Sequence, residues 1–181
     1  MNMGLKVIGV GLPRTGTTSL ATALAELLNC YPAKIHHGMK LQSLTDKQLN
    51  FWLKCLKNQV TDEEIREYFQ DFQAALDIPV ILIWKDLQRI YPEAKFILTV
   101  RDAEAIFESW HKTIGESLRV LHHPIYRWFL NQNHLVSSFM QQPFLIDSSC
   151  SIETLLCRFT KAEVLGKKKT AIIKIELNLE S

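Results

Sequence analysis

The sequence of 181 residues lacks the features that define several broad classes of protein. No apolar run reaches the ~18 residues of a membrane-spanning helix, and the N-terminus has no long apolar block or cleavage site of a signal peptide. The four cysteines show no C-x-x-C pairing, which favours reduced thiols in the cytoplasm. The net charge of +2 is too small to indicate binding to nucleic acid or to a membrane surface. We therefore expect one soluble, cytoplasmic domain over residues 1–181.

A lysine is also missing, from a loop close to the N-terminus. Residues 11–18, "GLPRTGTT", nearly match the phosphate-binding formula G-x-x-x-x-G-K-[ST], but Thr17 stands in the lysine position. A glycine loop that ends at a helix N-terminus still offers N–H groups and the positive end of the helix dipole to an anion. Gly16 allows close approach and Arg14 adds a fixed charge. The hydroxyl donors are Thr15, Thr17, Thr18 and Ser19.

What the loop binds depends on the missing lysine. Without it, and without a strand that ends in a convincing acidic partner for magnesium, a kinase or a nucleoside-triphosphatase fits poorly. A phosphosulfate donor, which needs no metal, fits a hydroxyl-rich loop with one cation. The alternative is a simple turn between a strand and a helix that binds no ligand.

Strand and helix patterns alternate over the first hundred residues. The alternation predicts an α/β, P-loop-like three-layer fold with a central parallel sheet and helices on both faces. Weaker patterns suggest helices over 125–140 and 151–165. The main segments are strands at 6–11, 73–77, 94–100 and 170–179, and helices at 17–29, 46–58, 62–72, 79–91 and 103–121, with a loop at 30–40.

Three of the predicted strands are followed directly by residues that could bind a ligand or take part in catalysis. The glycine loop follows the first strand, Asp77 the second and Arg101 the third. Because ligands of parallel sheets sit at the carboxyl ends of the strands, these groups are expected to meet in one site. The alternatives are a helix cap for Asp77 and a surface ion pair for Arg101.

Three stretches resemble the sulfotransferases that use 3′-phosphoadenosine 5′-phosphosulfate (PAPS). "PRTGTTS", residues 13–19, is similar to their 5′-phosphosulfate loop, and "ILTVRDAEAIFESW", residues 97–110, is similar to their 3′-phosphate motif. "LDIPVILIWKDLQRIYPEAKFILTVRD", residues 76–102, looks like a branch of the family familiar from flatworm parasites. The resemblance is strongest over residues 6–111.

The resemblance implies a reaction and a role for each matching residue. A sulfuryl group would pass from PAPS to a hydroxyl or amine of a small-molecule acceptor, leaving 3′,5′-adenosine bisphosphate (PAP), without a metal. Asp77 would be the general base, and Arg14 would stabilise the leaving phosphate. Arg101 and Ser109 would hold the 3′-phosphate, although Ser109 can also be read as a plain residue on the helix surface. The 5′-phosphosulfate would be held by Arg14, Thr15, Gly16, Thr17, Thr18 and Ser19.

Two further readings stay open beside the sulfotransferase. Relatives continue further and carry a second 3′-phosphate loop, for which residues 141–181 offer no clear match. An inactive, shortened relative that only binds a nucleotide or anion is therefore the second reading, and a P-loop kinase is the third. The paired histidines at 36–37 and 122–123 are interpreted as solvated loop residues, although the resemblance makes His37 a candidate for the acceptor pocket. No sequence feature indicates an oligomeric state.

Overall fold

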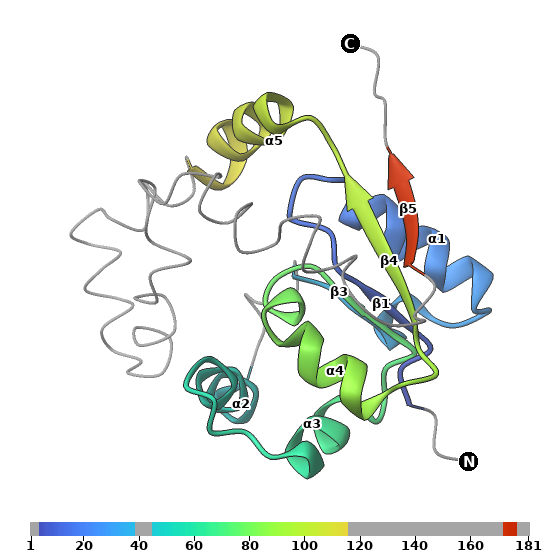
Figure 1. Cartoon of the computed structure of the whole chain (residues 1–181), viewed down its shortest axis with the longest axis vertical. Coiled ribbons are helices and arrows are strands. Elements are labelled where there is room, and N and C mark those ends of the chain that lie inside the picture. The colour runs from blue at the N-terminus through green and yellow to red at the C-terminus, as the bar shows by residue number, and fades with distance from the viewer. Residues whose placement is uncertain (1–3, 39–44, 116–171, 177–181) are drawn as a thin grey trace. The chain divides into compact units, whose positions relative to one another are not determined.

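A parallel five-stranded sheet, in the order β2-β3-β1-β4-β5, forms the centre of the first of two units (Figure 1). The computed structural model describes residues 4–38, 45–115 and 172–176. One compact unit contains residues 1–101 and 170–181, and the other contains residues 102–169. The strands are β1 (Val7–Gly9), β2 (Ile35–His36), β3 (Ala74–Leu76), β4 (Lys95–Val100) and β5 (Ile172–Glu176).

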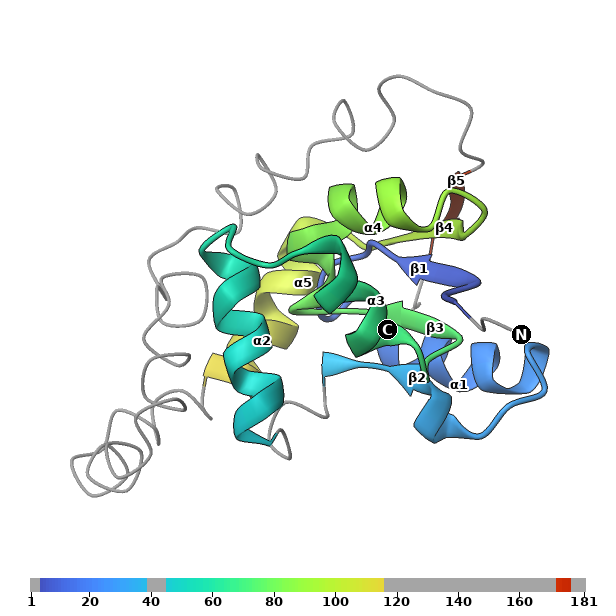
Figure 2. The same ribbon diagram turned by 90° about the horizontal axis from the view of Figure 1, so that it is seen from below.

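Helices cover both faces of this sheet, as the sequence predicts. Figure 2 shows α1 (Thr17–Leu27) on one side of the strands and α4 (Trp84–Ile90) on the other. α3 (Asp62–Phe69) contacts α4. Successive residues of a strand point to opposite faces, so both faces of β1 and β3 must be apolar. The core on the α1 side contains Val7, Leu24, Ala25, Ile35, Ala74, Leu76 and Ile97.

An aromatic cluster joins the edge strand β2 to α2 (Asp46–Leu56) and α3. Trp52 Nε1 donates to Tyr68 Oη at 2.9 Å, and Phe51 stacks on the Tyr68 ring with centroids 4.0 Å apart. His36 Nε2 lies 3.1 Å from the same Tyr68 oxygen. Because one hydroxyl ties two helices to the end of the sheet, the cluster fixes the position of β2.

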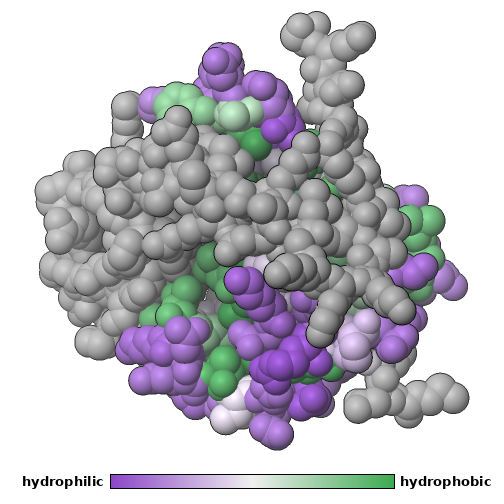
Figure 3. Space-filling view, in the orientation of Figure 1, coloured by the Kyte–Doolittle hydropathy of each residue, from purple (hydrophilic) through white to green (hydrophobic). Residues whose placement is uncertain are grey.

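The outer surface of these helices is charged. Hydrophilic side chains gather over α2, α3 and α4 in Figure 3. Ion pairs link neighbouring helices there, with Lys54 Nζ 2.6 Å from Glu64 Oε1 and Arg89 bound to Asp62. No helix in the described segments is long and apolar enough to cross a membrane.

Most predicted elements are confirmed, with shorter bounds. The helix expected over 79–91 begins instead as a 3-10 turn, Val80–Ile83, before α4. The main correction is β2, which lies inside the expected loop at 30–40 and follows a 3-10 turn at Pro32–Lys34. In the second unit, Asp102 caps α5 (Ala103–Trp110), and a π-helical turn, His111–Gly115, continues it. The helices predicted over 125–140 and 151–165 lie outside the described residues.

A capping box fixes the start of α3, and its contribution to the free energy of unfolding can be measured. Thr61 accepts a bond from the Glu64 amide at 3.2 Å while Glu64 accepts one from the Thr61 amide at 2.9 Å. Thr61→Ala removes this capping box and should lower the free energy of unfolding by about 0.5–2 kcal/mol, measured by urea denaturation. Thr22→Ala, the same change at an exposed position inside α1, is the control and should cost nothing. Equal losses in both variants would contradict the capping argument.

Candidate functional site

The loop between β1 and α1 is tied to the neighbouring strand β4. The Thr15 hydroxyl donates to the Leu12 carbonyl at 2.6 Å, and its oxygen lies 2.6 Å from Thr99 Oγ1 of β4. A Cβ on Gly11 would overlap that Thr99 hydroxyl, so only glycine fits there. Thr15 is 2 % exposed, and its hydroxyl therefore holds the loop rather than facing solvent.

The backbone of the loop has the left-handed conformations that are typical of anion-binding turns. Arg14 and Gly16 both adopt left-handed conformations, with φ of 70° and 88°. Gly16 is the N-cap of α1, and no side chain from the described part of the chain caps this helix. The first-turn amides have no intrahelical acceptor, so together with the helix dipole they favour an anion. The side chains of Arg14, Thr18 and Ser19 are exposed around this turn, whereas Thr17 is buried.

Arg101 meets the loop from the end of β4. Its Nη1 donates to the Arg14 carbonyl at 3.3 Å. β4 and β3 flank β1 on either side, so the three carboxyl ends that the sequence singles out are adjacent. The predicted convergence of the loop, Asp77 and Arg101 at one edge of the sheet is confirmed.

Asp77 is a buried carboxylate directly after β3. It has a φ of 71° and is 8 % exposed. Burial raises its pKa above the ordinary value, and this outweighs the lowering by His37, by hydrogen bonds from Ile78 and Thr17, and by the charge of Arg14. The alternative role as a helix cap is not observed, because the following 3-10 turn has Pro79 at its N-cap and no side-chain cap.

The histidines at 36–37 are buried, which corrects the prediction that they are solvated loop residues. They are 2 % and 7 % exposed, and they occupy the last position of β2 and the one after it. His37 Nε2 lies 3.2 Å from Thr17 Oγ1 and 3.4 Å from Asp77 Oδ2. The sequence missed this arrangement because a two-residue strand shows no periodicity. The pair at 122–123 lies outside the described residues.

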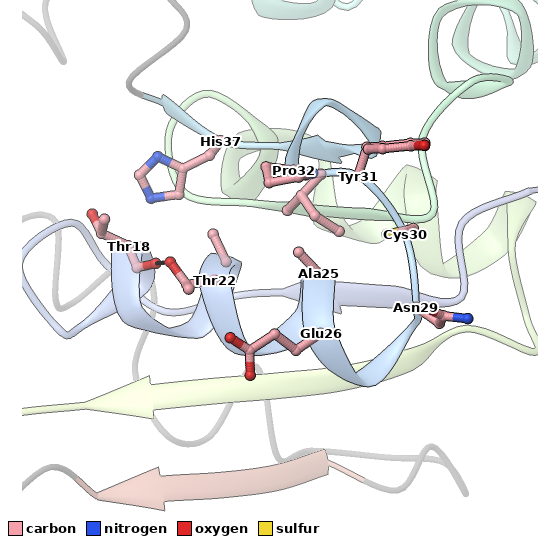
Figure 4. Close-up of a pocket in the computed structure, with 11 residues that line it drawn as sticks. Thr18, Thr22, Ala25, Glu26, Asn29, Cys30, Tyr31, Pro32 and His37 are labelled. Carbon is pink, nitrogen blue, oxygen red and sulfur yellow. Dashed lines mark hydrogen bonds between the residues drawn. The ribbon is translucent and has the colours of Figure 1, made fainter.

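A groove of about 700 Å³ runs along α1, beginning at Thr18 and His37 (Figure 4). Within the first turns of α1, the Thr22 hydroxyl donates a hydrogen bond to the Thr18 carbonyl at 3.2 Å. Small side chains on α1 leave the groove open, and Tyr31, which is 82 % exposed, lines its far part. The lining residues are Thr18, Ala21, Thr22, Ala25, Glu26, Asn29, Cys30, Tyr31, Pro32, Ile35 and His37.

Comparison with known proteins identifies the family. The sulfotransferase domain matches residues 6–150 of this chain. The chain belongs to the sulfotransferase family. It is similar to Ava biosynthesis cluster protein M of Aspergillus versicolor, with 27% identity over 117 residues, which is 61% of this chain. The chain thus covers 43% of that relative's length, less than half of it.

Ser109, the remaining residue that is predicted to bind the donor's 3′-phosphate, lies in the second unit. It is on α5, and its carbonyl accepts the Thr113 hydroxyl at 2.6 Å. Its pairing with Arg101 on one phosphate stays a prediction, as does the single domain over 1–181. Among the residues that the structure describes, no three histidine, cysteine or acidic side chains gather into a possible metal site.

The raised pKa of Asp77 predicts a pH-dependent effect on stability. Below the ordinary value of 3.8 the carboxyl is protonated in both the folded and unfolded states, and its burial costs nothing extra. As the pH rises through the folded pKa, the buried charge destabilises the protein. Asp77→Asn removes the charge and tolerates a positive φ, so its melting temperature at about pH 7 should exceed that of the parent. The difference should vanish near pH 4, by the same linkage.

A matched variant separates this effect from a general loss of negative charge. Asp71→Asn changes a side chain that is 78% exposed and should give no such pH-dependent difference. Melting curves over a pH series measure both variants. An Asp77→Asn protein that melts at or below the parent temperature at neutral pH would contradict the argument.

Proposed function

We propose that this chain transfers a sulfuryl group from PAPS to a hydroxyl or amine of a small-molecule acceptor. The observation that supports this most is the meeting of an anion-binding loop, a cation and a buried carboxylate at adjacent strand ends. The loop would take the phosphosulfate and Arg101 the far phosphate, while Asp77 would face the acceptor. Membership of the sulfotransferase family makes this the natural reaction for such a site.

The loop fits the phosphosulfate end of the donor. Its two left-handed residues and the uncapped start of α1 orient amides toward a negative group. Exposed side chains of Arg14, Thr18 and Ser19 surround the same turn. Thr15 contributes to donor binding by stabilising the conformation of the loop, because its hydroxyl donates to the Leu12 carbonyl and lies beside the Thr99 hydroxyl. Such preorganised donors stabilise charge that develops on the leaving phosphate.

The transfer then needs one base and no metal. The acceptor oxygen or nitrogen attacks sulfur, and the bond from sulfur to the phosphate oxygen breaks, with its electron pair leaving on PAP. Asp77 takes the acceptor's proton. Its raised pKa makes it a stronger base at neutral pH than an exposed aspartate. Arg14 and the loop amides stabilise the new negative charge on PAP.

The position of Thr17 favours this donor over a nucleoside triphosphate. A kinase would need a lysine there that reaches between the terminal phosphates. Thr17 is instead 5 % exposed, with its hydroxyl 3.2 Å from His37 Nε2. The residue at this position therefore connects the loop to the candidate base, which suits transfer between donor and acceptor.

Ligand binding tests the donor directly. PAP should raise the melting temperature of the full chain more than ATP with magnesium does, because the site lacks the lysine and a clear magnesium partner. Differential scanning fluorimetry with each ligand measures this. Stronger stabilisation by ATP and magnesium would favour the kinase, and no stabilisation by either would favour a turn that binds nothing.

Two arginine variants assign the PAP effect to the proposed site. Arg101→Ala removes a charged hydrogen-bond donor and should weaken PAP binding by about 1.5–3 kcal/mol, or about 10- to 150-fold. Arg66→Ala removes an exposed arginine on α3 and should leave PAP affinity unchanged. Equal affinities in both variants would remove Arg101 from the donor site.

The role of Asp77 is tested by transfer itself. With labelled PAPS and a panel of alcohols, phenols and amines, the parent should transfer sulfate. Asp77→Asn should lose transfer, since an amide cannot accept the proton, but should keep its affinity for PAP. Transfer that survives in Asp77→Asn would show another base. A parent that binds PAP but modifies no acceptor would support the second reading, a nucleotide-binding relative without activity.

A further inference from the structure

His37 lies between the donor loop and the candidate base. Its Nε2 is 3.2 Å from Thr17 Oγ1, at the start of α1, and 3.4 Å from Asp77 Oδ2, after β3. The side chains of His37 and Asp77 are only 8% and 12% exposed. With a proton on Nε2, the ring donates toward both oxygens from one atom. Few water molecules can compete for these bonds, so the contact can hold the carboxylate in one orientation.

The chain brings His37 to this place through its neighbour. His36 pairs with Ala75 in the β2–β3 ladder, and its ring sits in the aromatic cluster around Tyr68. The next residue points to the opposite side, which turns His37 toward α1 and Asp77. Gly38 then passes so close that an added Cβ would lie 2.8 Å from Asp77 Oδ2. The backbone and ring together therefore enclose this oxygen.

The two oxygens of Asp77 have different surroundings. Oδ2 faces His37 and Gly38. Oδ1 is buried, and no side chain or backbone group in the described part of the chain hydrogen-bonds to it. A buried polar atom without a partner is costly, and such atoms in native structures need an explanation. A substrate group that donates a hydrogen bond would satisfy Oδ1.

We propose that His37 is a positioning residue that holds Oδ2 of Asp77, so that Oδ1 receives the proton of the acceptor. The catalytic part rests on the proposed sulfuryl transfer. In that step the acceptor forms its bond to sulfur, the phosphate oxygen leaves with its electron pair, and the proton moves to Oδ1. His37 neither gains nor loses a proton. Its contact with Thr17 links the orientation of the base to the end of the donor loop, where α1 begins.

Two His37 variants test the proposal on the full chain. His37→Ala removes the contact, and His37→Gln replaces the ring by a neutral hydrogen-bond donor of similar reach. The transfer rate at saturating PAPS should fall about 10- to 100-fold in His37→Ala, since misplacement of a reacting group has effects of this size. His37→Gln should recover part of the rate, and PAP affinity should stay within about twofold of the parent in both variants.

Titration of the Asp77 carboxyl gives a readout that does not depend on activity. Carboxyl ¹³C NMR, assigned with Asp77→Asn, follows the pKa of Asp77 in each variant. The histidine lowers this pKa against the effect of burial, so His37→Ala should raise it further, and His37→Gln should have a smaller effect. His111→Gln changes an exposed histidine on the turn after α5 and is the control, expected to leave the Asp77 titration unchanged.

The outcomes separate this proposal from the proposed function. An unchanged Asp77 titration in His37→Ala, or a transfer rate that falls only together with PAP affinity, would overturn the positioning role. A parent that binds PAP but transfers to no acceptor would overturn the sulfotransferase activity, while the NMR shift would still report the contact. If His37→Ala does not fold, the titration and rate of His37→Gln decide in the same way.

Discussion

The close approach of β1 to its two neighbours is the constraint on which the rest of the site depends. β1 lies between β3 and β4, and Gly11 leaves room for the Thr99 hydroxyl just beyond its end. The bonds of Thr15 to Leu12 and its contact with Thr99 then fasten the loop to β4. A parallel sheet gathers its carboxyl ends at one edge, so the loop, Asp77 and Arg101 become neighbours although about 90 residues separate them.

Four hydroxyls in one short loop serve different purposes. Thr15 stabilises the turn and Thr17 contacts His37, whereas Thr18 and Ser19 remain exposed beside the helix N-terminus. The position that holds lysine in triphosphate-binding loops thus links the loop to the candidate base in this chain. Strain and buried polarity occur at the same residue, in the positive φ of Asp77 and in its Oδ1, which has no hydrogen-bond partner among the described residues. Such costs are typical of functional sites, where chemistry rather than stability selects the residue.

The edge strand β2 brings two neighbouring histidines to opposite faces of the sheet. His36 and His37 are adjacent but point to opposite sides of β2. One joins the aromatic cluster of α2 and α3, and the other reaches Thr17 and Asp77. Tyr68, which accepts from Trp52 and contacts His36, joins α2 and α3 to the strand that precedes His37.

Local patterns in the sequence were enough to determine β1, α1, β3 and β4, and the helices α2 and α3, which begin after threonine caps in the structure. They also placed the loop, Asp77 and Arg101 at one edge, because the carboxyl ends of parallel strands lie at the same edge of a sheet. Only the tertiary structure decided that the histidines at 36–37 are buried, that Thr17 contacts one of them, and that Asp77 is not a helix cap. The physical reason is that β2 is too short to show a period, and its contacts join residues 20 to 40 positions apart that no local signal relates.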